Sequence, residues 1–163
     1  MNWLIDLGNT RLKCAVMDGQ GALGEVHAFA HADPQAAQRL AELLGPADDG
    51  DTVWLASVAS LAATEALTSA VAAGGYRVER VRTRSRMGRL RIAYAEPARL
   101  GVDRFLAMLA ASERRDGPWL IVSVGSALTV DALAADGEHL GGLIAPTPQH
   151  VREAMAERFP VMN

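Results

Sequence analysis

Several chemically distinct side chains surround one glycine near the start of the chain, in the stretch LIDLGNTRLK (Leu4–Lys13). Lys13 is the only lysine in the sequence, since all other residues in the Lys and Arg count are arginines. Outward-pointing amides at a glycine turn form a concave anion site, and a nearby ammonium strengthens it. Asn9 and Thr10 add donors for phosphate oxygens, and Asp6, at a strand end, suits a Mg²⁺ ion held partly through water.

The same stretch also fits an ordinary hairpin, in which Gly8 and Asn9 only supply positive φ angles. Short motifs occur often by chance, so spacing alone favours this simpler interpretation. The single lysine and a second glycine turn at Gly125-Ser126 favour the phosphate site instead. Both interpretations stay open at this point.

The elements that would position this turn alternate between strands and helices. Strands are predicted at Trp3–Leu7, Arg11–Met17, Val53–Val58 and Tyr76–Val81, and helices at Asp33–Leu44 and Leu61–Ala73, the first with Asp33 as N-cap and Pro34 at its first position. Alternating strands and helices predict an α/β fold.

A second helix-rich piece is predicted from Val102 to about Arg115, and a lobe boundary follows it. The predicted domains are residues 1–116 and residues 117–163. The later part is expected to contain strands at Trp119–Val124 and Ala127–Ala134 and a helix over residues 147–159. IDLGNT (Ile5–Thr10) can be laid on VSVGSA (Val122–Ala127), so two lobes that each begin with a strand, a glycine turn and a second strand indicate duplication.

Composition narrows the class of protein. The 163 residues are 50% hydrophobic with a formal net charge of −3, which argues against general affinity for nucleic acid or anionic membranes. One cysteine excludes an internal disulfide and suits a reducing cytosol. The N-terminus has no signal-peptide pattern, and no apolar run is long enough to span a bilayer. A cytoplasmic protein is therefore expected.

Three motifs, in order, resemble one family, the type III pantothenate kinases. They are DLGNTRLK (Asp6–Lys13), YAEPARLGVDR (Tyr94–Arg104), and VGSALTVD followed by GGLIAP, the last two ending at Asp131 and Pro146. The resemblance spans nearly the whole chain. It implies the actin-like, ribonuclease H-like fold that actin, the sugar kinases and the acetate kinases share, with duplicated α/β lobes.

The resemblance also implies a reaction. The γ-phosphoryl group of ATP would pass to the primary hydroxyl of pantothenate, giving 4'-phosphopantothenate in the first step towards coenzyme A. ATP with Mg²⁺, pantothenate and a homodimer are the implied cofactor, substrate and assembly. The ATP phosphates would be held by Asp6, Leu7, Gly8, Asn9, Thr10, Arg11, Leu12 and Lys13, with Ser126 meeting ATP where the family usually has Thr.

The middle motif would bind pantothenate through Tyr94, Gly101, Val102, Asp103 and Arg104. Asp103 would accept the proton of the attacking hydroxyl, and a carboxylate near that hydroxyl can do so as the bond forms. Arg104 could fork onto the pantothenate carboxylate, and Gly101 lets a ligand approach the backbone. The alternative for Asp103 is a helix N-cap, which is a common use of aspartate.

The sequence departs from the family pattern in three places. The family's monovalent-cation position, for K⁺ or NH₄⁺, carries Ser123 instead of Asp, and a hydroxyl is a much poorer ligand for a hard cation, which puts cation activation in question. Thr147 replaces a glycine and would not tolerate a positive φ, so that turn is expected to differ. Family members also continue well past residue 163, so an incomplete second lobe is expected.

Other candidate sites are weaker. The stretch Arg77–Arg91 holds seven arginines without the interleaved aromatics of a nucleic-acid platform, so a solvated strand edge or a field that attracts ATP is favoured. His27 and His31 lack further ligands for a metal, and Cys14 is expected to be a small buried residue. A non-catalytic accessory protein that binds nucleotide without turnover is the alternative function, and a generic ATPase is a third.

Overall fold

The computed structural model describes residues 1–31, 33, 35–114 and 117–159. The chain divides into two compact units, Met1–Arg82 and Thr83–Asn163, and each is described by itself. Among the described residues, no helix is long and apolar enough to cross a membrane.

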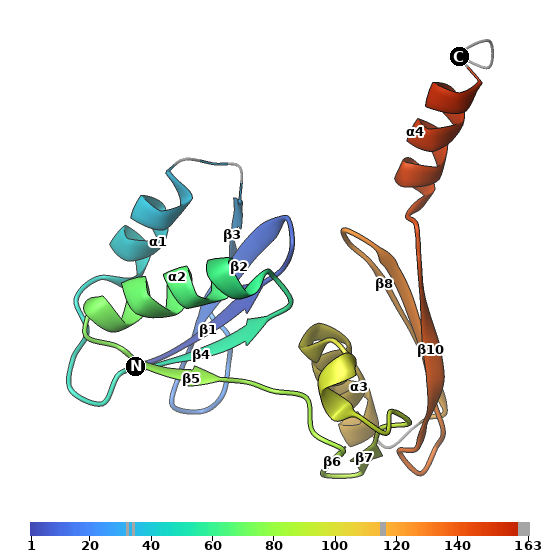
Figure 1. Ribbon diagram of the computed structural model, residues 1–163. Coiled ribbons are helices and arrows are strands. Elements are labelled where there is room, and N and C mark those ends of the chain that lie inside the picture. Colours follow the sequence, from blue (N-terminus) through green and yellow to red (C-terminus); the bar gives the residue numbers. More distant parts are fainter. Residues whose placement is uncertain (32, 34, 115–116, 160–163) are drawn as a thin grey trace. The chain divides into compact units, whose positions relative to one another are not determined.

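The first unit is a five-stranded mixed sheet with two helices (Figure 1). Its strands lie in the order β3-β2-β1-β4-β5, with β1 antiparallel to β2, β2 antiparallel to β3, and β1-β4-β5 parallel. The elements are β1 (Asn2–Leu7), β2 (Arg11–Met17), β3 (His27–Ala30), α1 (Ala36–Leu44), β4 (Thr52–Ser57), α2 (Leu61–Ala73) and β5 (Arg77–Arg80).

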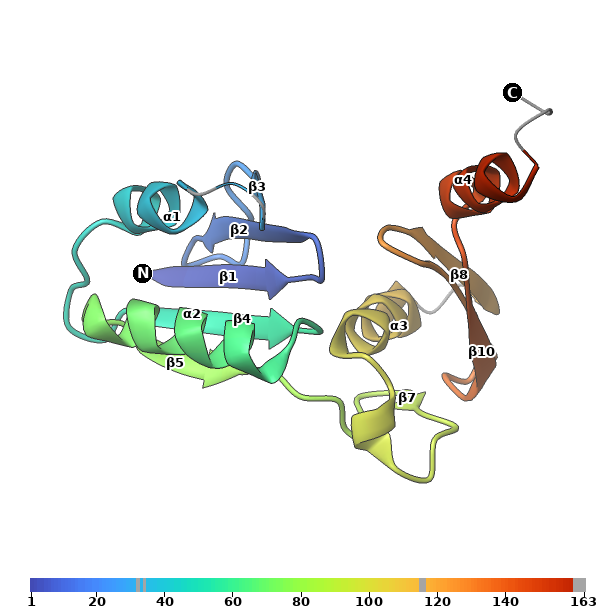
Figure 2. The ribbon, with the colours of Figure 1, turned by 45° about the horizontal axis from the view of Figure 1, so that its top comes forward.

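One face of this sheet forms the core of the first unit. Alternate residues of a strand point to opposite faces, so Trp3, Ile5 and Leu7 of β1 are buried while their neighbours are only partly covered. Leu40 of α1 and Val71 of α2 belong to the same buried cluster. Both helices therefore pack on one face, and Figure 2 shows α2 along the parallel strands.

The first helix starts later than the sequence predicts. α1 begins at Ala36, and its N-cap is Gln35, not Asp33. The reason is local, because the Asp33 carboxylate accepts the Gln35 N–H (2.9 Å) and the Asp33 carbonyl accepts the Ala36 N–H (3.0 Å). Asp33 therefore forms a turn of its own before the helix starts, and it does not serve as the helix N-cap. The predicted first helical position, Pro34, lies outside the described residues.

The second unit is built on a three-stranded antiparallel sheet in the order β10-β9-β8. Leu100, just before α3, and Phe105 and Met108, within it, are buried with Leu90 and Leu133 in the core of this unit. The elements are β6 (Arg86–Met87), β7 (Leu90–Arg91), a 3₁₀ turn at Pro97–Arg99, α3 (Val102–Arg114), β8 (Trp119–Val124), β9 (Leu128–Leu133), β10 (His139–Ala145) and α4 (Pro148–Arg158).

The two units repeat one local arrangement, as the sequence comparison predicts. β1-β2-β3 and β8-β9-β10 are both antiparallel three-strand runs joined through a glycine turn. Gly8 N–H donates to the Arg11 carbonyl (2.9 Å), and Gly125 N–H donates to the Ala127 carbonyl (3.0 Å). The predicted α/β organisation and the internal echo are thus confirmed.

Packing divides the chain earlier than the predicted boundary at residue 116. α3 contacts β8, β9 and β7, so it belongs to the second compact unit by its contacts. The difference arises because the apolar side of α3 packs on strands from both sides of it in the sequence, β7 before it and β8 and β9 after it.

Candidate active site

The predicted phosphate turn joins the end of β1 to the start of β2. The register pairs Asp6 with Lys13, and Lys13 Nζ lies 3.5 Å from Asp6 Oδ2. Both side chains are about half exposed, because Leu7 and Leu12 beside them take the buried positions. Asn9, Thr10 and Arg11 are exposed at the turn. The strand register alone thus brings the lone ammonium and the carboxylate together.

Gly8 is needed because the backbone of Arg11 comes close to it, and not because of an unusual φ angle. It is not among the glycines with a positive φ, so the simple explanation of a hairpin glycine does not hold for it. A Cβ on Gly8 would lie 3.1 Å from the Arg11 carbonyl oxygen, tighter than almost all real contacts. The glycine therefore lets the turn close, with its N–H bonded to that same oxygen.

Asp103 lies in the first turn of α3 and is exposed. The Phe105 N–H donates to the Gly101 carbonyl (3.1 Å), so the helix starts after Gly101 and Asp103 is inside it. Asp103 Oδ1 accepts the N–H of the next residue, Arg104 (2.8 Å). Asp103 is thus not the N-cap, and its carboxylate sits at the favourable end of the helix dipole.

Arg104, the next residue, points the other way and is buried. Its Nε donates to Asp131 Oδ2 (2.9 Å), and its Nη2 donates to Asp131 Oδ1 (2.6 Å). The Asp131 hydrogen bonds raise the pKa of Arg104 above its ordinary value, although burial of the guanidinium opposes this, and Tyr94 adds to the increase. Adjacent residues of the predicted substrate segment therefore have opposite surroundings.

A histidine that sequence reasoning missed, His139, contacts both Tyr94 and the acid that pairs with Arg104. The Tyr94 ring is stacked on the His139 ring, with centroids 6.0 Å apart and planes at 10°. His139 Nε2 lies 3.1 Å from Asp131 Oδ1. Asp131 ends the VGSALTVD motif, which by itself predicts no role for this residue. Asp131 is the one charged residue of β9, and this was the available signal, because a buried carboxylate needs partners.

The third motif places Ser123 on β8 and Ser126 in the turn that follows. Both residues are exposed. Ser123 pairs with Thr129 in the sheet, so neutral hydroxyls stand where a hard cation would need a carboxylate. These residues do not fit the monovalent cation that the family resemblance implies.

A Mg²⁺ ion would have few protein ligands here. No group of three or more His, Cys, Asp or Glu side chains that could hold a metal occurs in the described part of the chain. Mg²⁺ bound with a nucleotide commonly uses one or two carboxylates, waters and the phosphates themselves. The half-exposed Asp6 beside Lys13 fits that role.

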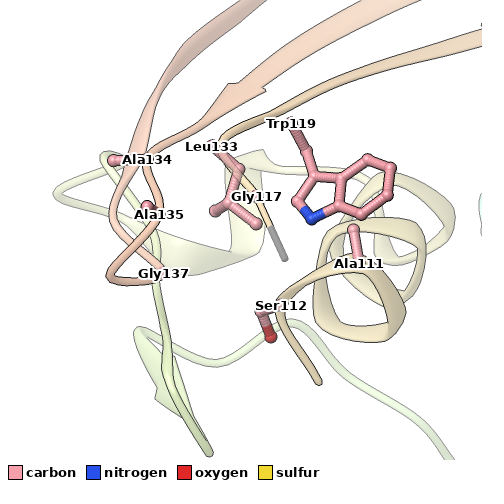
Figure 3. A pocket seen from close by; sticks show the side chains of 8 residues that line it. All are labelled: Ala111, Ser112, Gly117, Trp119, Leu133, Ala134, Ala135 and Gly137. Atoms are coloured by element: carbon pink, nitrogen blue, oxygen red, sulfur yellow. The ribbon is translucent and has the colours of Figure 1, made fainter. Parts of the chain in front are cut away.

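A small pocket elsewhere in the second unit is not the predicted site. Its empty volume is about 170 Å³, part of it open to solvent, which is below the usual size of a ligand site. Figure 3 shows the Trp119 indole beside Ala111 at this pocket. The lining residues include none of the predicted site residues and are Ala111, Ser112, Gly117, Trp119, Leu133, Ala134, Ala135 and Gly137.

The first part of the arginine-rich stretch lies in a strand at the edge of a sheet. β5 (Arg77–Arg80) is the outer strand of its sheet, as predicted. Arg80 Nη1 lies 2.6 Å from Glu65 Oε1, and Arg91 Nη2 lies 2.6 Å from Asp136 Oδ2. Carboxylates therefore already neutralise part of the positive charge.

Comparison with known proteins gives a consistent assignment. The family model described as type III pantothenate kinase matches residues 2–160. Type III pantothenate kinases of Xanthomonas campestris pv. campestris (strain 8004) and Xanthomonas oryzae pv. oryzae (strain PXO99A) are each 46% identical over 157 residues. These alignments cover 96% of this chain and 62% of each relative, so the chain spans less than two thirds of their length.

The fold comparison points the same way. The crystal structure of a putative 2-dehydro-3-deoxygalactonokinase from Sinorhizobium meliloti aligns with a TM-score of 0.54 at 16% identity, over 95% of this chain and 56% of that one. The fold is the actin-like α/β type that the sequence predicts. With a family model matching nearly every residue, the chain belongs to the type III pantothenate kinase family.

Proposed function

We propose that the protein transfers the γ-phosphoryl group of ATP to the primary hydroxyl of pantothenate, giving 4'-phosphopantothenate. The observation that supports this most is the family match over residues 2–160, which includes the three motifs in order. Phosphoryl transfer needs positioning and charge neutralisation more than covalent chemistry, and the site residues are of the types that supply both.

In this proposal the residues from Asp6 to Lys13 hold the ATP phosphates. The Lys13 ammonium and the exposed Asn9 side chain are the donors, since the Gly8 N–H is already bonded to the Arg11 carbonyl. Asp6 would ligate the Mg²⁺ ion that accompanies ATP, and Ser126 contacts the nucleotide. When bound, Mg²⁺ neutralises the charge of the β- and γ-phosphate oxygens. The half-exposed Asp6–Lys13 pair supports this assignment, since neither group is committed to the core.

Asp103 is the proposed proton acceptor. Its carboxylate is exposed in the first turn of α3, next to Gly101, where a hydroxyl could reach it. Tyr94, Gly101, Val102 and Arg104 would form the rest of the pantothenate site. We further propose that the protein is cytoplasmic and forms a homodimer. Size-exclusion chromatography with light scattering tests the dimer, since it should give the mass of two chains.

The first test follows ADP release from ATP and Mg²⁺ with and without pantothenate. We expect release that depends on pantothenate, and we expect Asp103→Asn to reduce it by about a hundredfold or more, because general-base catalysis contributes about 10²–10⁴. Asp49→Asn is the matched control, since Asp49 is an exposed aspartate outside the site. A phosphate monoester of pantothenate in the ³¹P spectrum identifies the product.

One observation favours a second candidate function. Ser123 occupies the family's cation position without a carboxylate, which fits a chain that binds nucleotide without turnover. ATP binding measured by calorimetry together with no ADP release would favour this accessory role. ADP release that pantothenate does not change would instead indicate a generic ATPase, and either result would contradict the proposed kinase.

A further inference from the structure

Asp131 is a buried carboxylate whose position the proposed reaction has not yet explained. It is 1% exposed in the middle of β9, next to the apolar residues Val130 and Ala132. Burying a carboxylate is unfavourable unless hydrogen bonds and an opposite charge compensate for the lost water. Asp131 has both, since Arg104 donates two hydrogen bonds and His139 lies within reach of Oδ1.

The histidine is held in one orientation. His139 is 1% exposed, and its Nδ1 accepts the Ala93 N–H (3.4 Å). With Nδ1 as an acceptor, the ring hydrogen is on Nε2, which can then donate to Asp131 Oδ1 (3.1 Å). The Asp131 carboxylate therefore receives three donors and has little freedom to rotate.

The backbone leaves room for this cluster only because of a glycine. A Cβ on Gly142 would overlap Asp131 Oδ1, the Val130 carbonyl oxygen and Arg104 Nη2. Gly142 pairs directly with Asp131 across β10 and β9. The second glycine of the GGLIAP motif thus has a steric function: it allows the ion pair to form against the strand.

We propose that Asp131 and His139 are positioning residues for the pantothenate segment. Asp131 fixes the Arg104 guanidinium, and Arg104 anchors the first turn of α3, so the neighbouring Asp103 carboxylate faces solvent. His139 fixes the Asp131 carboxylate and supports the Tyr94 ring by stacking. The inference rests on the proposed function, since Tyr94, Asp103 and Arg104 are its substrate residues.

The decisive variant is Asp131→Asn, which keeps the shape of the side chain and removes its charge. We expect the KM for pantothenate to rise about tenfold or more, because an oriented charge-assisted hydrogen bond contributes at least that factor. The KM for ATP should stay unchanged, since the hydrogen bonds of Asp131 described above go to Arg104 and His139 and not to the proposed ATP contacts, Asp6 to Lys13 and Ser126. If kcat falls while both KM values stay unchanged, Asp131 is only structural and the proposal is overturned.

His139→Gln provides a second variant if Asp131→Asn does not fold. It removes the imidazole but keeps a donor for Asp131, so a smaller increase in the same KM is expected. His150→Gln is its control, because His150 is exposed on α4. Gly142→Ala should reproduce the effect of Asp131→Asn, whereas Gly19→Ala should not, since a Cβ on Gly19 would contact nothing within 4 Å.

A measurement independent of turnover separates this inference from the proposed function. Hydrogen–deuterium exchange should become faster over residues 101–108 in Asp131→Asn and stay unchanged over β1 and β2. If the unaltered chain shows no pantothenate-dependent ADP release, the proposed function fails, while faster exchange still supports the anchoring of α3. Unchanged exchange over residues 101–108 overturns the positioning role.

Discussion

Cys14 faces the core of the five-stranded sheet, and burial decides its chemistry. The side chain is 2% exposed, and burial raises the pKa of the thiol from 9.0 to about 11. A thiolate is the reactive form, so at pH 8 the reactive fraction should be about a hundredfold lower than in the unfolded chain. Reaction with a thiol-specific chromogenic reagent should therefore be at least that much slower in the native protein than in urea.

The same experiment has an internal control and a clear contrary result. Cys14 is the only cysteine, so all the signal comes from one position. Because the pKa of the thiol is raised in the folded state, the native thiol should gain reactivity only as the pH rises from 9 towards 11. Over the same range, ionisation of the thiol should lower the free energy of unfolding. Equal rates in native and unfolded protein at pH 8 would mean that Cys14 is accessible.

Local pairs could be predicted at the residue scale, and distant ones could not. The Asp6–Lys13 pair follows from a hairpin whose register is set by the alternation of Leu7 and Leu12 with polar residues. The Arg104–Asp131 pair joins residues 27 apart, and the sequence between them contains nothing that predicts which acid would meet the arginine. Asp131 as a buried acid was inferable, but its partner depends on how α3 packs on β9.

Thr147 stands where the family pattern has a glycine, and in this chain it caps the helix that follows the turn. Its φ is −69°, and its side chain accepts the His150 N–H (3.3 Å) as the N-cap of α4, with Pro148 next. α4 has no buried residue, so the cap is an important part of its stability. Thr147→Ala should destabilise this helix by about 1 kcal/mol, whereas Thr147→Ser should have little effect.

Amide exchange over residues 148–158 measures this effect directly. The loss should be local, because α4 adds no side chain to the core of its unit. The midpoint of global unfolding should therefore stay the same in both variants. A lower midpoint for Thr147→Ala would show that α4 contributes to the fold through contacts other than its own turns.

Helix boundaries were predictable where the signals were local and unambiguous. α2 spans Leu61–Ala73, as predicted: Ser60 caps it by accepting the Ala63 N–H, and glycines follow it. α1 starts later than predicted because Asp33 is equally suited to a turn of its own. The choice between a cap and a turn depends on the path of the chain after β3, which sequence patterns do not contain.

At the scale of the whole molecule, the two glycine turns were predictable from the similar sequences around them. The assignment of α3 to one of the two compact units was not. The echo of IDLGNT in VSVGSA corresponds to two hairpins in which the glycine N–H donates across the turn, to the carbonyl three residues ahead at Gly8 and two residues ahead at Gly125. The place of α3, in contrast, depends on which strands cover its apolar side. That side contacts β7, β8 and β9, which belong with α3 to the second compact unit.

The second sheet exposes an apolar face, and this should dominate the behaviour of the chain in solution. Leu120, Val122 and Val124 alternate along β8 and are 67%, 53% and 68% exposed, whereas Trp119 and Ile121 pack towards α3. An exposed apolar sheet face favours association and binding of hydrophobic dyes.

Changing all three residues to Thr, which keeps strand propensity, should reduce dye fluorescence and raise the concentration at which the protein aggregates. The unfolding midpoint should not fall, because these side chains bury little, while the control Ile121→Thr on the opposite face should lower it. Equal destabilisation by the triple change and by Ile121→Thr would mean that both faces of β8 are covered in solution.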